Sequence, residues 1–181
     1  MLGNESLWTV ALNFERLLSQ SGIPYSICGG VAVCLHGYKR NTTDIDVIIQ
    51  STDIDWVKGL LIAELFVWHP QSSEFRSSSG VPVRFLMGGE QAGKGSEVTI
   101  PKPQVELNRE HRDGLPVVRL SRLIEMKLAS GLGSMRRMHK DFADVVELIA
   151  IRNLDSSFAR HLHPSVRPAF RDHVQRVNND D

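Results

Sequence analysis

Two aspartates one residue apart are the most chemically suggestive feature of this sequence. Asp44 and Asp46 lead into the apolar run 47–49, and on a strand such residues project from the same face, about 6.5–7 Å apart. Neighbouring carboxylates raise each other's pKa unless a cation lies between them. In proteins that cation is commonly Mg²⁺, held by one or two carboxylates together with substrate phosphates. The pair therefore predicts a site for Mg²⁺ or Mn²⁺.

Two glycines upstream of the aspartates suit a phosphate. Gly29 and Gly30 follow the short apolar run 25–28 and precede a compact helical segment. Glycines at a strand end that opens a helix allow backbone N–H groups to approach a phosphate closely. Either feature alone is typical of an ordinary turn or a solvated strand end. Their combination favours a metal-dependent phosphate site.

Together these residues resemble the signature of the nucleotidyltransferase superfamily, whose members share a polymerase-β-like fold. The signature is Gly-Gly or Gly-Ser, roughly ten residues, and then Asp-hydrophobic-Asp at the start of a strand. The resemblance implies that Asp44 and Asp46 are catalytic and hold the metal. It also implies that four residues around the motif bind nucleotide: Gly29, Gly30, Arg40 and Thr42.

The run 123–149 extends the resemblance. It is similar to the Lys-Leu-Ala and Lys-Asp-x-x-Asp-Val segments of bacterial minimal and AbiEii-type toxin nucleotidyltransferases. By that resemblance Lys127 and Asp141 are catalytic residues near the nucleotide, and Asp144 is the other acid. Lys127 also interrupts an apolar helical stripe, so its ammonium must reach solvent or meet an anionic partner.

The chain departs from the superfamily pattern at one strand. The superfamily has a third carboxylate in a Gly-Val-x-Val-Asp context, whereas the run 80–86 reads GVPVRFL and has Arg84 at that position. Arg84 is an obligate cation, and we expect it on the face of Asp44 and Asp46. There it either neutralises them in place of a second metal or binds the triphosphate. Three glutamates do not fit the strand register of the missing carboxylate: Glu74, Glu90 and Glu106.

A second glycine-rich segment, 87–96, begins like a phosphate-binding P-loop but does not complete the motif. Gly88, Gly93 and Lys94 match G-x-x-x-x-G-K, yet position 95 is glycine rather than Ser or Thr. Prolines at 101 and 103 prevent the helix that such a loop requires. We interpret the segment as a mobile surface loop and leave open a contact between Lys94 and a substrate.

The elements that position these residues follow from hydrophobic periodicity. Helices are predicted at 5–20, 31–37, 53–65, 121–130 and 138–151, with polar helices at 156–162 and 166–177. Ser121 is expected to cap one helix, and Gly131 and Gly133 to end it. Strands are predicted at 25–28, 44–49, 81–86 and 115–120, with a weak strand within 72–79. This is an α/β (α+β) fold, a small mixed sheet flanked by helices. Residues 1–120 form its core and 121–181 a helical C-terminal part of one compact unit.

Length and composition exclude several classes of protein. At 181 residues the chain can bury a substantial core, and its 21 basic and 21 acidic residues create no global field for nucleic acid or membrane. Cys28 and Cys34 are too few for a disulfide framework. We find no signal peptide and no apolar run long enough to cross a membrane. A cytoplasmic protein without a membrane partner is expected.

The sequence therefore predicts a Mg²⁺-dependent enzyme that transfers a nucleoside monophosphate from an NTP and releases pyrophosphate. The alternative is a catalytically degenerate member that binds nucleotide or a partner protein, because Arg84 replaces a carboxylate. A plain scaffold is the third interpretation. The acceptor is RNA, a protein or a small molecule, and the AbiEii resemblance implies a cognate antitoxin-like partner.

Overall fold

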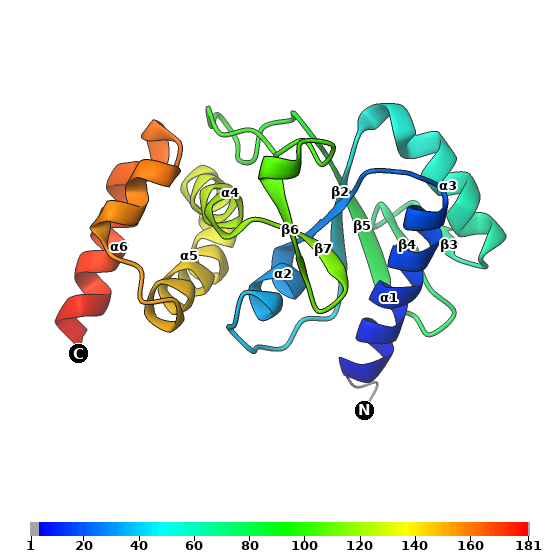
Figure 1. Cartoon of the computed structure of the whole chain (residues 1–181), viewed down its shortest axis with the longest axis horizontal. Coiled ribbons are helices and arrows are strands. Elements are labelled where there is room, and N and C mark those ends of the chain that lie inside the picture. The colour runs from blue at the N-terminus through cyan, green and yellow to red at the C-terminus, as the bar shows by residue number, and fades with distance from the viewer. Residues whose placement is uncertain (1–3, 181) are drawn as a thin grey trace.

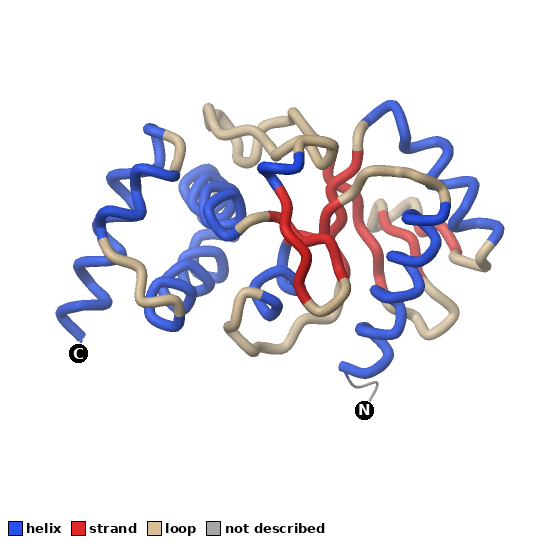
Figure 2. The backbone as a smooth tube through the Cα atoms, viewed as in Figure 1, coloured by secondary structure: helices blue, strands red, loops and turns tan. Residues whose placement is uncertain are grey.

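A computed structural model of the chain describes residues 4–180, and within them seven strands form one sheet in the order β3-β4-β5-β2-β1-β7-β6. The strands are β1 (Ser26–Cys28), β2 (Ile45–Ile49), β3 (Val67–His69), β4 (Glu74–Arg76), β5 (Pro82–Met87), β6 (Arg109–Arg112) and β7 (Leu115–Val118). β2 runs parallel to β5 and β1 parallel to β7, whereas the other neighbours are antiparallel. Figure 2 shows this mixed sheet with helices on both sides of it.

Helices flank the sheet and extend beyond one end of it. They are α1 (Asn4–Gln20), α2 (Gly29–Leu35), α3 (Ile54–Ala63), α4 (Leu120–Gly133), α5 (Met135–Ile151) and α6 (Arg167–Asp180). In Figure 1, α4, α5 and α6 lie together at one end of the molecule, and α1 and α3 lie at the other. Within residues 4–180 no helix is long and apolar enough to cross a membrane.

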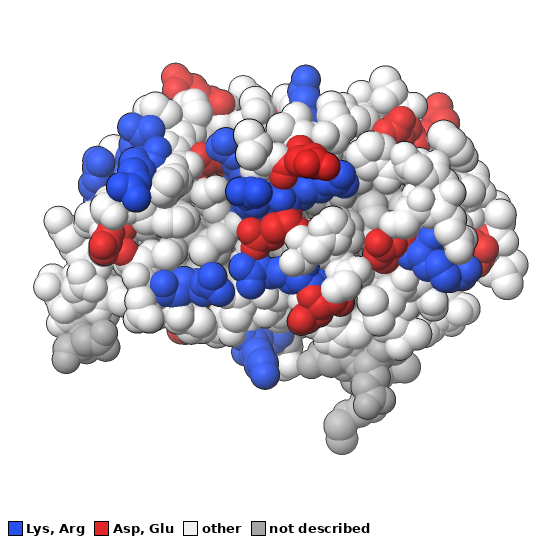
Figure 3. Space-filling model, in the orientation of Figure 1, with Lys and Arg blue, Asp and Glu red and all other residues white. Residues whose placement is uncertain are grey.

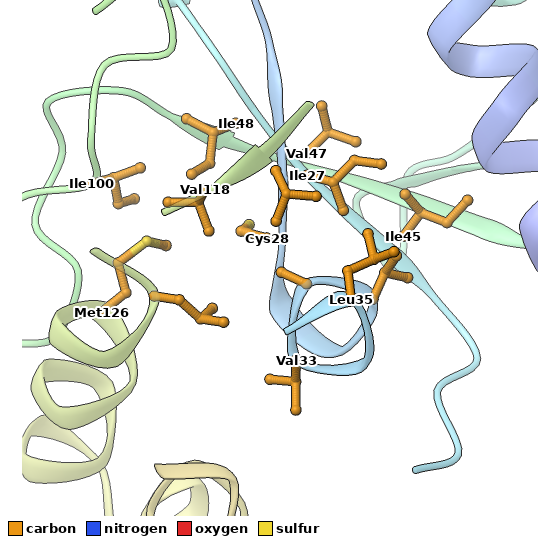
Figure 4. Packing of buried hydrophobic residues seen from close by; sticks show 14 of the residues in the cluster. Ile27, Cys28, Val33, Leu35, Ile45, Val47, Ile48, Ile100, Val118 and Met126 are labelled. Carbon is orange, nitrogen blue, oxygen red and sulfur yellow. The ribbon is translucent and has the colours of Figure 1, made fainter. Parts of the chain in front are cut away.

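One face of β2 is wholly apolar, whereas the other carries Asp46 next to the buried Ile48. Ile45, Val47 and Ile49 are fully buried on one face. On that face the rings of Phe14 from α1 and Phe85 from β5 lie 6.2 Å apart, so α1 covers it. Figure 4 shows buried side chains from α2, α4 and the strands β1, β2 and β7 meeting in the adjoining layer. This packing fixes the strands that carry the aspartates.

The predicted fold class is confirmed, but two edge strands, β3 and β6, were not predicted. In β3 the side chains of Val67 and Trp68 are both exposed, and β6 reads REHR. Neither segment has the alternation of buried and exposed residues by which a strand is recognised in sequence. Their strand geometry comes instead from pairing with β4 and β7.

The helix α4 corrects the predicted cap and the predicted end. Arg119 occupies the N-cap position, without a side-chain capping bond, because β7 leads almost directly into the helix. Ser121 is therefore not the cap, and the helix continues through Gly131 to Gly133. A Cβ on Gly131 would lie 2.4 Å from the Phe142 ring of α5. The glycine allows α4 and α5 to pack closely. Judged by helix propensity alone, the same glycine indicates a helix end.

Three further helix boundaries differ from the prediction. The helix predicted at 31–37 begins at Gly29, so the glycine pair forms its first turn. The helix α5 begins at Met135, three residues before the predicted start. The helix α3 ends at Ala63, two residues before the predicted end, and Leu65 is 76% exposed with a left-handed φ of 64°. Boundaries of this kind depend on tertiary contacts more than on local pattern.

Candidate active site

Four side chains form a row across one face of four neighbouring strands. Asp46 of β2 pairs in register with Cys28 of β1 and with Arg84 of β5. The antiparallel register of β4 on β5 sets Glu74 beside Arg84, and the two side chains form an ion pair at 2.9 Å. Arg84 therefore lies where it was predicted, beside Asp46. Glu74 lies on the next strand, beside the position of the missing carboxylate and not in it, and the pairing of β4 that brings it to Arg84 could not be read from the sequence.

Asp44 lies immediately before β2, next to this row. Arg84 donates a hydrogen bond from Nη1 to Oδ2 of Asp44 at 2.6 Å, which confirms the expected contact between the arginine and the aspartate pair. Asp44, Asp46 and Gly29 line the same cavity. The predicted arrangement of two carboxylates on one face, beside the glycine turn, is therefore confirmed.

The cavity has a volume of about 460 Å³ and lies between the sheet and the helices α4 and α5. Its charged lining consists of three acids and four bases: Asp44, Asp46, Asp141, Arg84, Lys127, Arg137 and Lys140. Hydroxyls come from Ser72, Ser73 and Ser130, and an apolar wall from Leu86, Ala92, Leu123 and Met126. This volume falls within the range of small-molecule sites, and the excess of cations suits an anionic ligand.

Asp46 is the acid best suited to hold a metal ion. Among the described residues its carboxylate forms no hydrogen bond or ion pair, in contrast to Asp44. Burial, and then the charge of Asp44, raise the pKa of Asp46 above its ordinary value. A divalent cation would reverse this effect and stabilise the ionised carboxylate. Within residues 4–180 no group of three His, Cys, Asp or Glu residues could hold a metal. The aspartate pair could hold one cation only if its other ligands came from a bound ligand or from water.

Gly29 makes room for Asp46. Its φ of 62° is left-handed, and a Cβ at this position would lie 2.0 Å from Oδ2 of Asp46. Both the backbone conformation and the close approach therefore require glycine. The turn from β1 into α2 thus brings backbone next to the carboxylate.

We expect Gly29→Ala to displace Asp46 and to reduce nucleotide-dependent activity at least 100-fold, since a misplacement of about 1 Å can cost that much. Gly22→Ala is the matched control. Gly22 has a similar φ of 67°, but nothing lies within 4 Å of a Cβ there. Both variants should lose about 1 kcal/mol of stability from left-handed strain. Thermal unfolding and activity measured on the same samples separate the two effects. Equal activity in the two variants would show that activity does not depend on the placement of the Asp46 carboxylate beside Gly29.

Lys127 meets anionic partners, as the interrupted apolar stripe predicted. The side chain is buried, and its Nζ lies 2.6 Å from Oδ2 of Asp144 and 3.1 Å from Oδ1 of Asp141. Both acids come from α5, so the three charges join the helices α4 and α5 beside the cavity. Burial alone would raise the pKa of Asp141, but the charge of Lys127 and hydrogen bonds hold it below its ordinary value.

Comparison with known proteins shows which solved structures share this fold. No family model and no curated protein matches the chain. Among solved structures, the antibiotic-resistance factor ANT(2'')-Ia is similar over 98% of each chain, with a TM-score of 0.57 and 11% identity. Its complex with adenylyl-2''-tobramycin matches 92% of this chain and 98% of its own, at TM-score 0.57 and 12% identity. An antigenic nucleotidyltransferase-like protein from Paracoccidioides brasiliensis matches 81% of this chain and 77% of its own, at TM-score 0.52 and 20% identity. The chain has a nucleotidyltransferase-like fold.

Three residues expected at the nucleotide lie outside the cavity lining of this nucleotidyltransferase-like fold: Gly30, Arg40 and Thr42. Arg40 instead binds Asp144 with two hydrogen bonds, 2.6 Å from Nε and 2.9 Å from Nη2. A Cβ on Gly30 would lie 2.3 Å from Oγ1 of Thr42. These residues hold the segment before β2 against α2 and α5. They support the elements that form the site and do not line the cavity.

Two cations of the site were not predicted. Arg137 and Lys140 of α5 line the cavity, and Nε of Arg137 donates to Oδ2 of Asp141 at 3.1 Å. The available signal is the basic run 136–140, RRMHK, directly before Asp141. Residues three and four apart share a helix face, so this run could have been placed beside the predicted acid.

Lys94 does not reach this cavity. It lines a second cavity of about 370 Å³ together with Leu132, Gly133 and Ser165. The glycine-rich loop packs closely on α4, since a Cβ on Gly93 would lie 2.1 Å from the carbonyl oxygen of Ala129. The rejected P-loop motif is thus a loop that supports α4. A contact between Lys94 and a ligand of the aspartate site has no support in the structure.

Proposed function

We propose that the protein transfers a nucleoside monophosphate from an NTP to a hydroxyl acceptor with Mg²⁺ or Mn²⁺. The observation that carries the proposal is the meeting of the aspartate pair and Gly29 with a cationic wall from α4 and α5 in one cavity. The fold supports it, since ANT(2'')-Ia has been solved in complex with adenylyl-2''-tobramycin. Phosphoryl transfer commonly uses carboxylates that hold a metal ion and cations that bind the phosphates, and the aspartate pair and the basic residues of the cavity could supply both.

The charged residues of the cavity have different proposed roles, which follow from their charge and exposure. Asp44 and Asp46 would hold one divalent cation, which when bound neutralises phosphate charge and polarises the phosphoryl group. Arg137 and Lys140 have exposed side chains at the cavity and would bind the phosphates. Lys127 is fixed by Asp141 and Asp144, so it offers a positioned charge without the cost of ordering a mobile side chain.

The proposed reaction needs no covalent intermediate with the protein. The acceptor hydroxyl oxygen bonds to the α-phosphorus as the bond from that phosphorus to the pyrophosphate oxygen breaks. Pyrophosphate leaves, and the hydroxyl proton passes to solvent. Positioning and charge stabilisation supply most of the catalysis in such phosphoryl transfers.

Incubation with NTPs labelled at the α-phosphorus, in Mg²⁺ or Mn²⁺, tests the proposal. Three arms contain pooled RNA, protein and small hydroxylated molecules. Label transferred to any acceptor, with one pyrophosphate released per label, supports the proposal. Label transferred in none of the arms, under conditions where the nucleotide binds, contradicts it.

A second candidate function is nucleotide binding without transfer. The observation that favours it is the 2.6 Å contact between Arg84 and Asp44, which occupies one of the two aspartates in the protein alone. Binding of a fluorescent NTP analogue at the aspartate site, with no pyrophosphate released from NTP, would favour this candidate. Pyrophosphate release that needs Asp46 would exclude it.

The resemblance to AbiEii-type toxins extends the proposal to a cognate antitoxin-like partner and a cytoplasmic location. Neither the antitoxin-like partner nor the cytoplasmic location follows from the geometry of the cavity. If the chain acts as a toxin, induced expression in bacteria should arrest growth, and Asp46→Asn should relieve the arrest. Normal growth during strong expression of the natural chain would contradict the toxin assignment and leave the transfer proposal intact.

A further inference from the structure

Arg84 is held at both ends of its guanidinium group. Nη1 lies 2.6 Å from Oδ2 of Asp44, and on the other side Nε and Nη2 lie 3.0 and 2.9 Å from Oε2 of Glu74. Two carboxylates from different segments of the chain thus fix one planar cation. Charge-assisted hydrogen bonds of this length are among the stronger polar contacts in proteins. The guanidinium is therefore positioned before any ligand binds.

Glu74 is an unusual anchor because it is almost inaccessible to solvent, with 1% exposed. Its Oε1 accepts hydrogen bonds from Arg76 at 2.7 and 2.9 Å, which leaves Oε2 for Arg84. Burial alone would raise the pKa of Glu74, but hydrogen bonds from the two arginines hold it below its ordinary value. The acid stays ionised and directs Arg84 toward the aspartates.

The position of Arg84 decides what else can bind there. Arg84 pairs in register with Asp46 and contacts Asp44 directly, so a fixed positive charge lies beside both predicted metal ligands. Two-metal sites hold their ions about 3.5–4 Å apart and need ligands for both. The third carboxylate that the resemblance predicts is absent, and its position carries a cation that repels a second metal ion.

We propose that the Arg84 guanidinium, positioned by Glu74, replaces the second divalent cation, so that this protein binds nucleotide with one metal ion per chain. The inference rests on the proposed function and adds to it the number of metal ions. Arg84 would stabilise phosphate charge that a second metal would otherwise neutralise. Glu74 is a positioning residue, since it touches Arg84 and does not line the cavity.

Electron paramagnetic resonance of Mn²⁺ counts the bound ions. With a saturating, non-hydrolysable NTP analogue, the natural chain should bind one Mn²⁺ and Arg84→Asp should bind two. Arg84→Met removes the charge without adding a ligand, and should tighten the single Mn²⁺ about tenfold in the absence of nucleotide. The last experiment does not depend on turnover or on a nucleotide.

Arg76→Met is the matched control. Arg76 binds the same glutamate, and its side chain is 45% exposed, as is that of Arg84, but it does not line the cavity. This variant should keep one Mn²⁺ at an affinity within about twofold of the natural chain. Two Mn²⁺ ions in the natural chain, or equal Mn²⁺ affinity in the two methionine variants, would overturn the inference. If the NTP analogue does not bind at all, the proposed function fails, and the metal-only comparison still decides the role of Arg84.

Discussion

Asp46→Asn is expected to reduce nucleotidyl transfer about 1,000-fold or more and at the same time to increase stability. The loss of rate corresponds to about 4 kcal/mol of barrier, because the variant loses the charge of the proposed metal ligand. The gain in stability follows from the raised pKa of Asp46, whose causes are burial first and the charge of Asp44 second. Steady-state transfer rates and thermal unfolding in the presence of a chelator measure the two effects.

The stability effect of Asp46 depends on pH through the protons that its carboxyl binds. A carboxyl whose pKa is higher in the folded than in the unfolded chain binds more protons when folded. Stability therefore falls as the pH rises from about 3.9, the value for unfolded Asp, through the raised pKa of Asp46. Asparagine carries no charge, so the variant should exceed the natural chain at neutral pH and lose this advantage in acid.

Two controls distinguish the metal ligand from a general effect of removing an acid. Asp44→Asn should also lose transfer, but without a gain in stability, because Arg84 loses a partner at 2.6 Å. Asp55→Asn changes an exposed acid in the first turn of α3 and should change neither quantity by much. A destabilised Asp46→Asn variant, or one with full activity, would contradict the role of Asp46.

Much of the site could be predicted because its signals are local. Strand periodicity placed Asp44 and Asp46 on one face, and helical periodicity showed that Lys127 had to reach solvent or meet an anionic partner. Charge is interleaved over the surface in Figure 3, without an extended patch of one sign on that face, in agreement with the balanced composition. These features depend on spacing and composition, which a sequence states directly.

The parts that could not be predicted depend on contacts between distant segments. Glu74 joins Arg84 only because β4 pairs with β5, and a one-residue change of register would turn it to the other face. Arg137 reaches the cavity because α5 packs against α4, where Gly131 lets Phe142 approach closely. Residue types alone indicate a helix end at that glycine and a solvated charge at the glutamate.

Lys127→Met is expected to destabilise the protein by roughly 3–5 kcal/mol, the cost of removing one partner from a buried ion pair. Lys127 is 6% exposed, and it contacts Asp141 and Asp144, which are 1% and 2% exposed. Methionine fills similar space, so the main loss is the charge. For a chain of this size the melting temperature should fall by roughly 6–20 °C. Thermal and urea unfolding measure the change.

The control for Lys127→Met is Arg137→Met, which removes another cation from Asp141. The Arg137 side chain is 62% exposed, so its loss should cost at most about 1 kcal/mol.

The pH dependence of the stability difference between the natural chain and Lys127→Met separates lost charge from lost packing. In the natural chain burial raises the pKa of Asp141, but the charge of Lys127, together with Arg137 and the hydrogen bonds to Asp141, outweighs burial and lowers this pKa. This carboxylate therefore stabilises the fold above about pH 3.9 and less as the pH falls through its lowered pKa. Without Lys127, burial opposes its ionisation. The stability gap between natural chain and variant should therefore widen from pH 3 to pH 7, and a constant gap would show that lost packing, rather than unpaired buried charge, is the cause.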